Sequence, residues 1–167
     1  IDPRWLSEEM SWRQVGKMGR GNFADSITGR VPNGVGDPAS LERYDKKNEA
    51  SGFIATLHDA EVRERFARVP QGSTDSVSRA PRLKLDGYCP TLRAGTGKDR
   101  GSYQSLRPIH PTANRVITPR EAARLQGFPD WFLFHPTKWH SFRQIGNSVS
   151  PLVAEKILRI IFAKMHI

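Results

Sequence analysis

The chain has 167 residues, and 26 Lys and Arg against 17 Asp and Glu give it a formal net charge of +9 at pH 7. This length allows one domain with a substantial core, and the positive charge favours a polyanionic partner. A single cysteine, Cys89, excludes an internal disulfide, and the lack of a long apolar run or a signal peptide indicates a cytoplasmic protein with no membrane partner.

The first 90 residues are rich in Gly, Pro, Ser and Asp, a composition that predicts short strands and loops with little helix. Residues 12–15 are typical of a strand end. Residues 16–22 then place three glycines and two cations in a loop. This loop is either a flexible turn or a segment that closely approaches a phosphate or a groove, with Lys17 and Arg20 reaching outward.

Two helices are predicted next. Residues 38–48 form a charged, helical stretch with a solvated face. Residues 59–69 place Val62, Phe66 and Val69 three to four positions apart, the spacing of a short amphipathic helix.

Residues 82–85 and 88–93 are predicted to be strands, and residues 94–101 form a second loop rich in glycine and cations. Its two alternating glycines do not indicate a dinucleotide site. That site requires an apolar strand before the loop and an apolar helix after it, whereas Lys98 and Arg100 lie within a polar segment here.

Residues 118–129 carry strong signals for a helix with defined ends. Thr118 and Glu121 have the spacing of a capping box, and Pro119 suits the first helical position. Gly127 and Pro129 are expected to end the helix.

The rest of the chain is predicted to be an aromatic, irregular corner over residues 130–140 and a small-residue turn over residues 146–148. A long helix follows and runs to about Met165. It carries a broad apolar face that requires cover: Val153, Ile157, Ile160 and Ile161.

The second half of the chain contains four short motifs in order: residues 107–111, Arg115, residues 118–129 and residues 144–151. In this order and at this spacing they closely resemble the last two conserved motifs of the DNA (cytosine-5) methyltransferases. The resemblance is dense from residue 107 onward and loose before it. It implies a bacterial protein that associates with the nucleoid when bound to DNA.

The same resemblance shows what this sequence lacks. In the family, the nucleophilic cysteine follows a proline, whereas here Cys89 precedes Pro90. We therefore expect Cys89 to be a buried or strand-edge thiol. The glycine-rich cofactor loop, the Glu-Asn-Val motif and the Gln-x-Arg-x-Arg motif are also missing. The chain, which begins at Ile1 without Met, is expected to be a piece of a longer protein with no transferase activity of its own.

The resemblance also implies site residues. Thr91 and Leu92 are similar to the Thr-Leu pair that lies near the backbone of the extruded nucleotide, and the two glycine-rich segments are similar to recognition loops. The expected DNA-binding residues are Lys17, Arg20, Thr91, Leu92, Arg93, Lys98 and Arg100. Asn147, Ser148 and Val149 resemble the turn that borders S-adenosylmethionine. No metal site is expected, because the histidines and the single cysteine lack zinc-ligand spacing.

We therefore predict an α+β protein. Residues 1–106 would form a small, irregular, strand-rich target-recognition region, and residues 107–167 the C-terminal motifs, a bridging helix and a closing helix of the catalytic domain. The implied function is recognition of a duplex DNA target within a restriction-modification methyltransferase, so that an N-terminal catalytic half can flip and methylate cytosine.

Other possibilities stay open. The catalytic half could lie in the same polypeptide or in a separate subunit, and the chain could instead be a stand-alone DNA-binding subunit without chemistry. Without a catalytic domain to cover it, the closing helix is expected either to pack on its own chain or to pair with a second copy in a homodimer.

Overall fold

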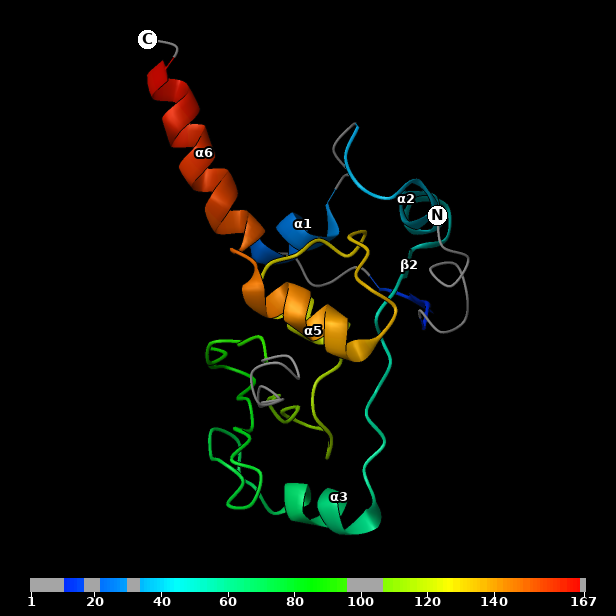
Figure 1. Ribbon diagram of the computed structural model, residues 1–167, viewed down its shortest axis with the longest axis vertical. Helices are drawn as coiled ribbons and strands as arrows, with labels where there is room; N and C mark the ends of the chain where they lie inside the picture. The colour runs from blue at the N-terminus through cyan, green and yellow to red at the C-terminus, as the bar shows by residue number, and fades with distance from the viewer. Residues whose placement is uncertain (1–10, 17–21, 30–33, 96–106, 166–167) are drawn as a thin grey trace.

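The computed structural model describes residues 11–16, 22–29, 34–95 and 107–165. Figure 1 shows α5 near the middle of the molecule, α3 at one end and α6 projecting at the other. In chain order, the elements are β1 (Arg13–Gln14), α1 (Asn22–Thr28), α2 (Pro38–Lys47), β2 (Glu49–Ala50), α3 (Ala60–Ala67), α4 (Pro119–Leu125), α5 (Lys138–Asn147) and α6 (Pro151–Met165). The presence of both helices and a sheet agrees with the predicted α+β class.

The first region is irregular, as predicted, but within the described residues it is not rich in strands. Its sheet consists of β1 and β2, which pair antiparallel with Arg13 opposite Ala50. The strands predicted over residues 82–85 and 88–93 are wrong. Arg82 forms an isolated bridge with Ile109, and residues 88–93 have no regular structure. Pro81 and Pro90 help to explain this, because proline lacks the N–H that a continuous ladder requires.

The two helices predicted in this region are confirmed as α2 and α3. Each begins with an aspartate whose side chain accepts a hydrogen bond from a backbone N–H of the first turn, namely Asp37 from Ser40 and Asp59 from Val62. Such caps satisfy donors that would otherwise be unpaired. The helix α1 was not predicted, because residues 22–28 carry a mixed polar and apolar pattern without a clear period.

Two apolar clusters hold the described parts together, and each contains residues from both sides of position 106. Ile109 and Val116 join Phe66 of α3 in the first cluster. The second cluster contains Leu83, Ile117, Ala122, Ala123, Phe128, Phe134 and Ile145, with Cys89, Leu92 and Phe142 packed against it. The C-terminal motifs therefore share their cores with the residues that precede them.

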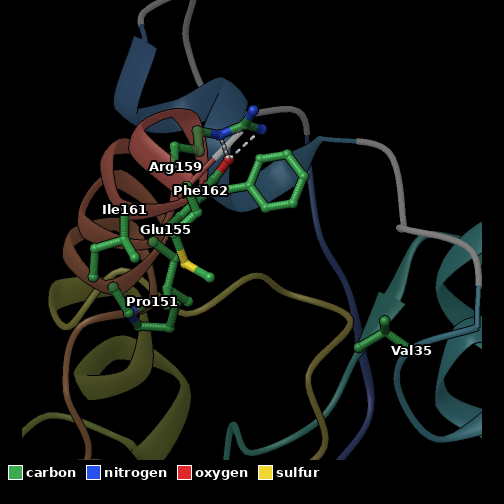
Figure 2. Close-up of a pocket in the computed structure, with 9 residues that line it drawn as sticks. Val35, Pro151, Glu155, Arg159, Ile161 and Phe162 are labelled. Carbon is green, nitrogen blue, oxygen red and sulfur yellow. Dashed lines mark hydrogen bonds and ion pairs between the residues drawn. The ribbon is translucent and has the colours of Figure 1, made fainter. Parts of the chain in front are cut away.

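The closing helix, α6, has no buried residue along its length. Ile160 is 61% exposed and Ile161 is 48% exposed. Ile161 and Phe162 of α6 line a cleft of about 1010 Å³ together with Val35, and Figure 2 shows Phe162 projecting from α6 toward the side where Val35 lies. The expectation that α6 packs on its own chain is thus wrong in this structure, whereas pairing with a second copy stays a prediction. No helix in the described segments has the length and apolarity needed to cross a membrane.

Candidate functional site: a junction between the recognition segment and the C-terminal motifs

The helix α4 begins with the predicted capping box. The Thr118 side chain accepts a hydrogen bond from the Glu121 backbone N–H at 3.2 Å, and the Glu121 carboxylate accepts one from the Thr118 N–H at 2.7 Å. Gly127 follows the helix with φ of 84°, a left-handed conformation that glycine adopts without strain. The predicted start and end of this helix are both confirmed.

Glu121 also forms a bidentate ion pair with Arg115, with N–O distances of 2.8 and 2.7 Å. Burial opposes ionisation of this carboxyl group. The hydrogen bonds from Arg115 and from the Thr118 backbone nevertheless hold the pKa of Glu121 below its usual value. The carboxylate is therefore ionised at neutral pH and fixes the segment before α4 to its first turn.

Arg120 is buried and contacts backbone carbonyl groups. Its guanidinium donates hydrogen bonds to the carbonyls of Ser51 at 2.8 Å, Pro129 at 3.2 Å and Phe132 at 2.7 Å. Burial lowers the pKa of Arg120 to about 10, so the side chain is charged at neutral pH. Arg120 thus joins the segment after β2 to the loop between α4 and α5.

Two further polar contacts hold the C-terminal motifs against each other. Arg124 forms a bidentate ion pair with the fully buried Asp130, at 2.8 and 2.7 Å. The Gln126 side-chain amide donates to the Ser148 carbonyl at 3.1 Å. The end of α4 is therefore bonded directly to the segment that follows α5.

The predicted turn over residues 146–148 is wrong, because Gly146 and Asn147 form the last turn of α5. The predicted irregular corner is also too long, since α5 begins at Lys138. Its N-cap residue, Thr137, forms no side-chain capping bond. The sequence therefore lacked the capping signal that identified α4.

The three residues expected to border the cofactor lie at the end of α5 and just beyond it. Asn147 and Val149 are exposed, and Ser148 is partly buried. The Ser148 side chain donates to the Ile145 carbonyl at 2.7 Å, which closes the end of the helix. These residues form a continuous surface segment.

The segment with the Thr-Leu pair lies beside this helix end. Leu92 packs against the second apolar cluster, while Thr91 and Arg93 are exposed. A cleft of about 290 Å³ lies between this segment and the C-terminal motifs. Its lining residues are Cys89, Pro90, Thr91, Leu92, Leu125, Gln126, Gly146 and Ser148.

Cys89, in the same cleft, has the properties of a structural thiol. It is partly buried and packs against the second apolar cluster. Burial raises the pKa of Cys89 to about 11, so the thiol is protonated at neutral pH. Because the thiolate is the nucleophilic form, this environment does not activate Cys89.

Four of the expected DNA-binding residues, Lys17, Arg20, Lys98 and Arg100, lie outside the described residues. Among the described residues, Thr91, Leu92 and Ser148 lie together at one cleft, and Arg93 is adjacent in the chain.

The close packing of Gly146 against the Arg93 and Ala94 backbone was not predicted. The sequence analysis placed Gly146 in a turn, where a glycine needs no further explanation.

Comparisons with known proteins identify the family to which the chain belongs. The chain is 57% identical over 107 residues to the type II methyltransferase M.XorII of Xanthomonas oryzae, a match that covers 64% of this chain and 25% of the relative. It is 27% identical over 147 residues to the type II methyltransferase M.AgeI of Thalassovita gelatinovora, covering 87% of this chain and 33% of the relative.

A solved structure described as a putative DNA modification methyltransferase encoded within a prophage of E. coli matches with a TM-score of 0.82 and 51% identity. The match covers 93% of this chain and 41% of that one. The chain therefore spans less than half the length of these relatives. The model of the C-5 cytosine-specific DNA methylase family matches residues 9–163, and the chain thus belongs to this family.

Proposed function

We propose that this chain is the part of a DNA (cytosine-5) methyltransferase that recognises the DNA target. Cytosine flipping and methyl transfer would be performed by a catalytic half that uses S-adenosylmethionine. Residues 1–106 would contact the target, and residues 107–167 would connect this region to the catalytic half. The cleft that joins the Thr91 segment to the end of α5 is the observation that carries this proposal.

The cleft supports the proposal because it places two surfaces of different chemistry side by side. Thr91 and Arg93 are exposed, and a hydroxyl group and a guanidinium group are suited to DNA phosphates and base edges. Asn147 and Val149 are exposed and are the chain neighbours of Ser148, which lines the cleft. A ligand bound near them would lie close to the recognition segment.

Charge and motif content also support target recognition by this chain and methyl transfer by a separate catalytic half. The net charge of +9 suits a polyanion, and Lys17, Arg20, Lys98 and Arg100 add cations to the two glycine-rich segments. The family's Pro-Cys nucleophile motif does not occur in these 167 residues. The chemistry would then depend on residues outside this sequence, in the same polypeptide or in a partner subunit.

Asn147, Ser148 and Val149 would border S-adenosylmethionine once the catalytic half is in place. Among the described residues, the glycine-rich cofactor loop of the family has no equivalent. This chain alone would therefore bind the cofactor only weakly.

A binding experiment tests the proposal. The purified chain is incubated with a pool of randomised duplex DNA, and bound molecules are sequenced. We expect enrichment of one short sequence and an affinity that falls steeply with salt, as phosphate contacts require. We also expect no methyl transfer from S-adenosylmethionine to this DNA. Failure to enrich any sequence would contradict target recognition. Methyl transfer by the chain alone would contradict the proposal that a separate catalytic half performs the chemistry.

A further inference from the structure

The last turn of α5 touches the backbone of the recognition segment at Gly146. A Cβ atom at this position would lie 2.5 Å from the Ala94 backbone nitrogen and 2.7 Å from the Arg93 carbonyl carbon. Both distances are far below ordinary van der Waals contact. The helix α5 can therefore lie this close to residues 93 and 94 only because Gly146 has no side chain.

Backbone freedom does not explain this glycine. Gly146 is helical, and its φ is not among the positive values found at Gly34, Gly36, Gly52, Gly72 and Gly127. An alanine is favoured over glycine within an unobstructed helix. The helix at this position thus retains a residue that is unfavourable for it, and the close approach to residues 93 and 94 supplies the reason.

Neither partner in this contact can readily move away. The helix α5 is held in place by the fully buried Ile145 and by the hydrogen bond from Gln126 to the Ser148 carbonyl. On the recognition segment, Leu92 packs against the second apolar cluster. A methyl group at position 146 would therefore displace the backbone at Arg93 and Ala94, because that is the exposed end of the contact.

We infer that Gly146 is a positioning residue for Arg93. Its missing side chain lets α5 support the Arg93 backbone directly, and the direction in which the Arg93 guanidinium leaves the surface depends on that support. Gly146 itself would contact no DNA. The inference rests on the proposed function, in which Arg93 contacts the target.

A double-mutant cycle tests this relationship, with the affinity for a duplex that carries the enriched sequence as the readout. Arg93→Ala is expected to weaken binding about 5-fold or more if it removes a base contact, or to flatten the slope of log affinity against log salt by about 0.9 if it removes a phosphate contact. Gly146→Ala should reproduce the same change. The double variant should be no weaker than Arg93→Ala alone. Ala67→Ser, which adds one heavy atom at an exposed helical position, is the matched control and should bind as the original chain does.

The outcomes separate this inference from the proposed function. If the original chain does not bind DNA, or Arg93→Ala changes nothing, the assignment of Arg93 fails. If Arg93→Ala weakens binding while Gly146→Ala does not, only the positioning role fails. Additive losses in the double variant would also overturn it, because they would show that Gly146 acts independently of Arg93.

A second measurement decides the matter if Gly146→Ala does not fold. In the original chain, a nuclear Overhauser effect is expected between a Gly146 α-proton and the Ala94 amide proton, since the two backbones are in contact. Its absence in the folded chain would show that α5 does not support this segment, and the inference would be wrong.

Discussion

The Arg120 guanidinium donates a hydrogen bond to the Ser51 carbonyl at 2.8 Å, across 69 positions of sequence. The same guanidinium reaches the carbonyls of Pro129 and Phe132. A planar group with several fixed donors can bond to all three carbonyls at once. Arg120 therefore determines how the segment after β2 lies against the loop between α4 and α5.

Replacement of Arg120 by lysine should destabilise the chain strongly. Lysine keeps the charge, but its single ammonium group cannot match three carbonyls placed around a planar fork. Each unsatisfied buried acceptor costs about 1–3 kcal/mol, and we expect Arg120→Lys to lower the free energy of unfolding by about 3 kcal/mol. Urea denaturation measures this change. The exposed Arg143→Lys is the control and should alter stability by less than about 0.5 kcal/mol. A similarly small effect of Arg120→Lys would contradict the role of the three carbonyls.

The ion pair of Glu121 with Arg115 predicts a pH-dependent contribution to stability. The pKa of Glu121 is lowered in the folded state, so the folded protein binds fewer protons at this group than the unfolded chain. The stabilisation is fully present above the unfolded pKa of about 4.3 and is lost as pH falls through the folded pKa. We expect Glu121→Gln to reduce stability by about 1–2 kcal/mol at pH 7.

The same comparison should be made at several pH values by chemical denaturation. The difference between Glu121→Gln and the original chain is expected to shrink as pH falls from about 5 to 3. Glu64→Gln is a suitable control, because Glu64 and its partner Arg68 are both exposed. A difference for Glu121→Gln that stays constant over this range would show that the carboxylate charge does not stabilise the fold.

The exposed apolar face of α6 predicts association between copies of the isolated chain. Burying several aliphatic side chains is worth about 1.5–3 kcal/mol each, which gives α6 a strong tendency to find a surface. Light scattering of the original chain should show a concentration-dependent dimer. The double variant Ile157→Glu with Ile161→Glu should be monomeric and almost as stable, since both side chains are about half exposed.

Lys156→Glu is the control for charge, because Lys156 lies on the same helix and is exposed but not apolar. It should leave the dimer intact. If the original chain is monomeric at every concentration and residues 152–163 exchange their amide protons freely, the apolar face does not mediate association.

The cations outside the described residues provide a separate test of DNA contact. Lys17→Ala, Arg20→Ala, Lys98→Ala and Arg100→Ala should each either flatten the salt dependence of DNA binding by about 0.9 or relax specificity at one position, with about 1–3 kcal/mol lost. Lys46→Ala removes the same charge from the exposed face of α2 and should have a smaller effect. Four variants with unchanged affinity and salt dependence would exclude these cations from the interface.

Local patterns in the sequence identified α2, α3 and α4. Thr118 and Glu121 lie three positions apart and indicated where α4 begins, and the spacing of Val62, Phe66 and Val69 indicated α3. The helix α5 has no capping side chain, and its start could not be recognised in the same way. The strands predicted around Pro81 and Pro90 failed because pairing depends on partners elsewhere in the chain.

The geometry of the site depended even more on distant partners. The Thr-Leu pair and residues 147–149 were identified by resemblance, but nothing local shows that Thr91, Leu92 and Ser148 line one cleft. The three carbonyls around Arg120 and the backbone against Gly146 also come from other segments. These contacts follow from tertiary packing and required the structure.

A chimaeric enzyme tests the central claim most directly. The segment of M.XorII that aligns with this chain is replaced by the corresponding residues of this chain, and the purified chimaera is tested for folding and for binding of S-adenosylmethionine. We predict that it methylates cytosine in duplex DNA and that Arg93→Ala in the exchanged segment changes the sites that it methylates. A folded chimaera that binds the cofactor but methylates no DNA, or whose sites do not depend on the exchanged segment, would contradict the proposal that this chain recognises the target.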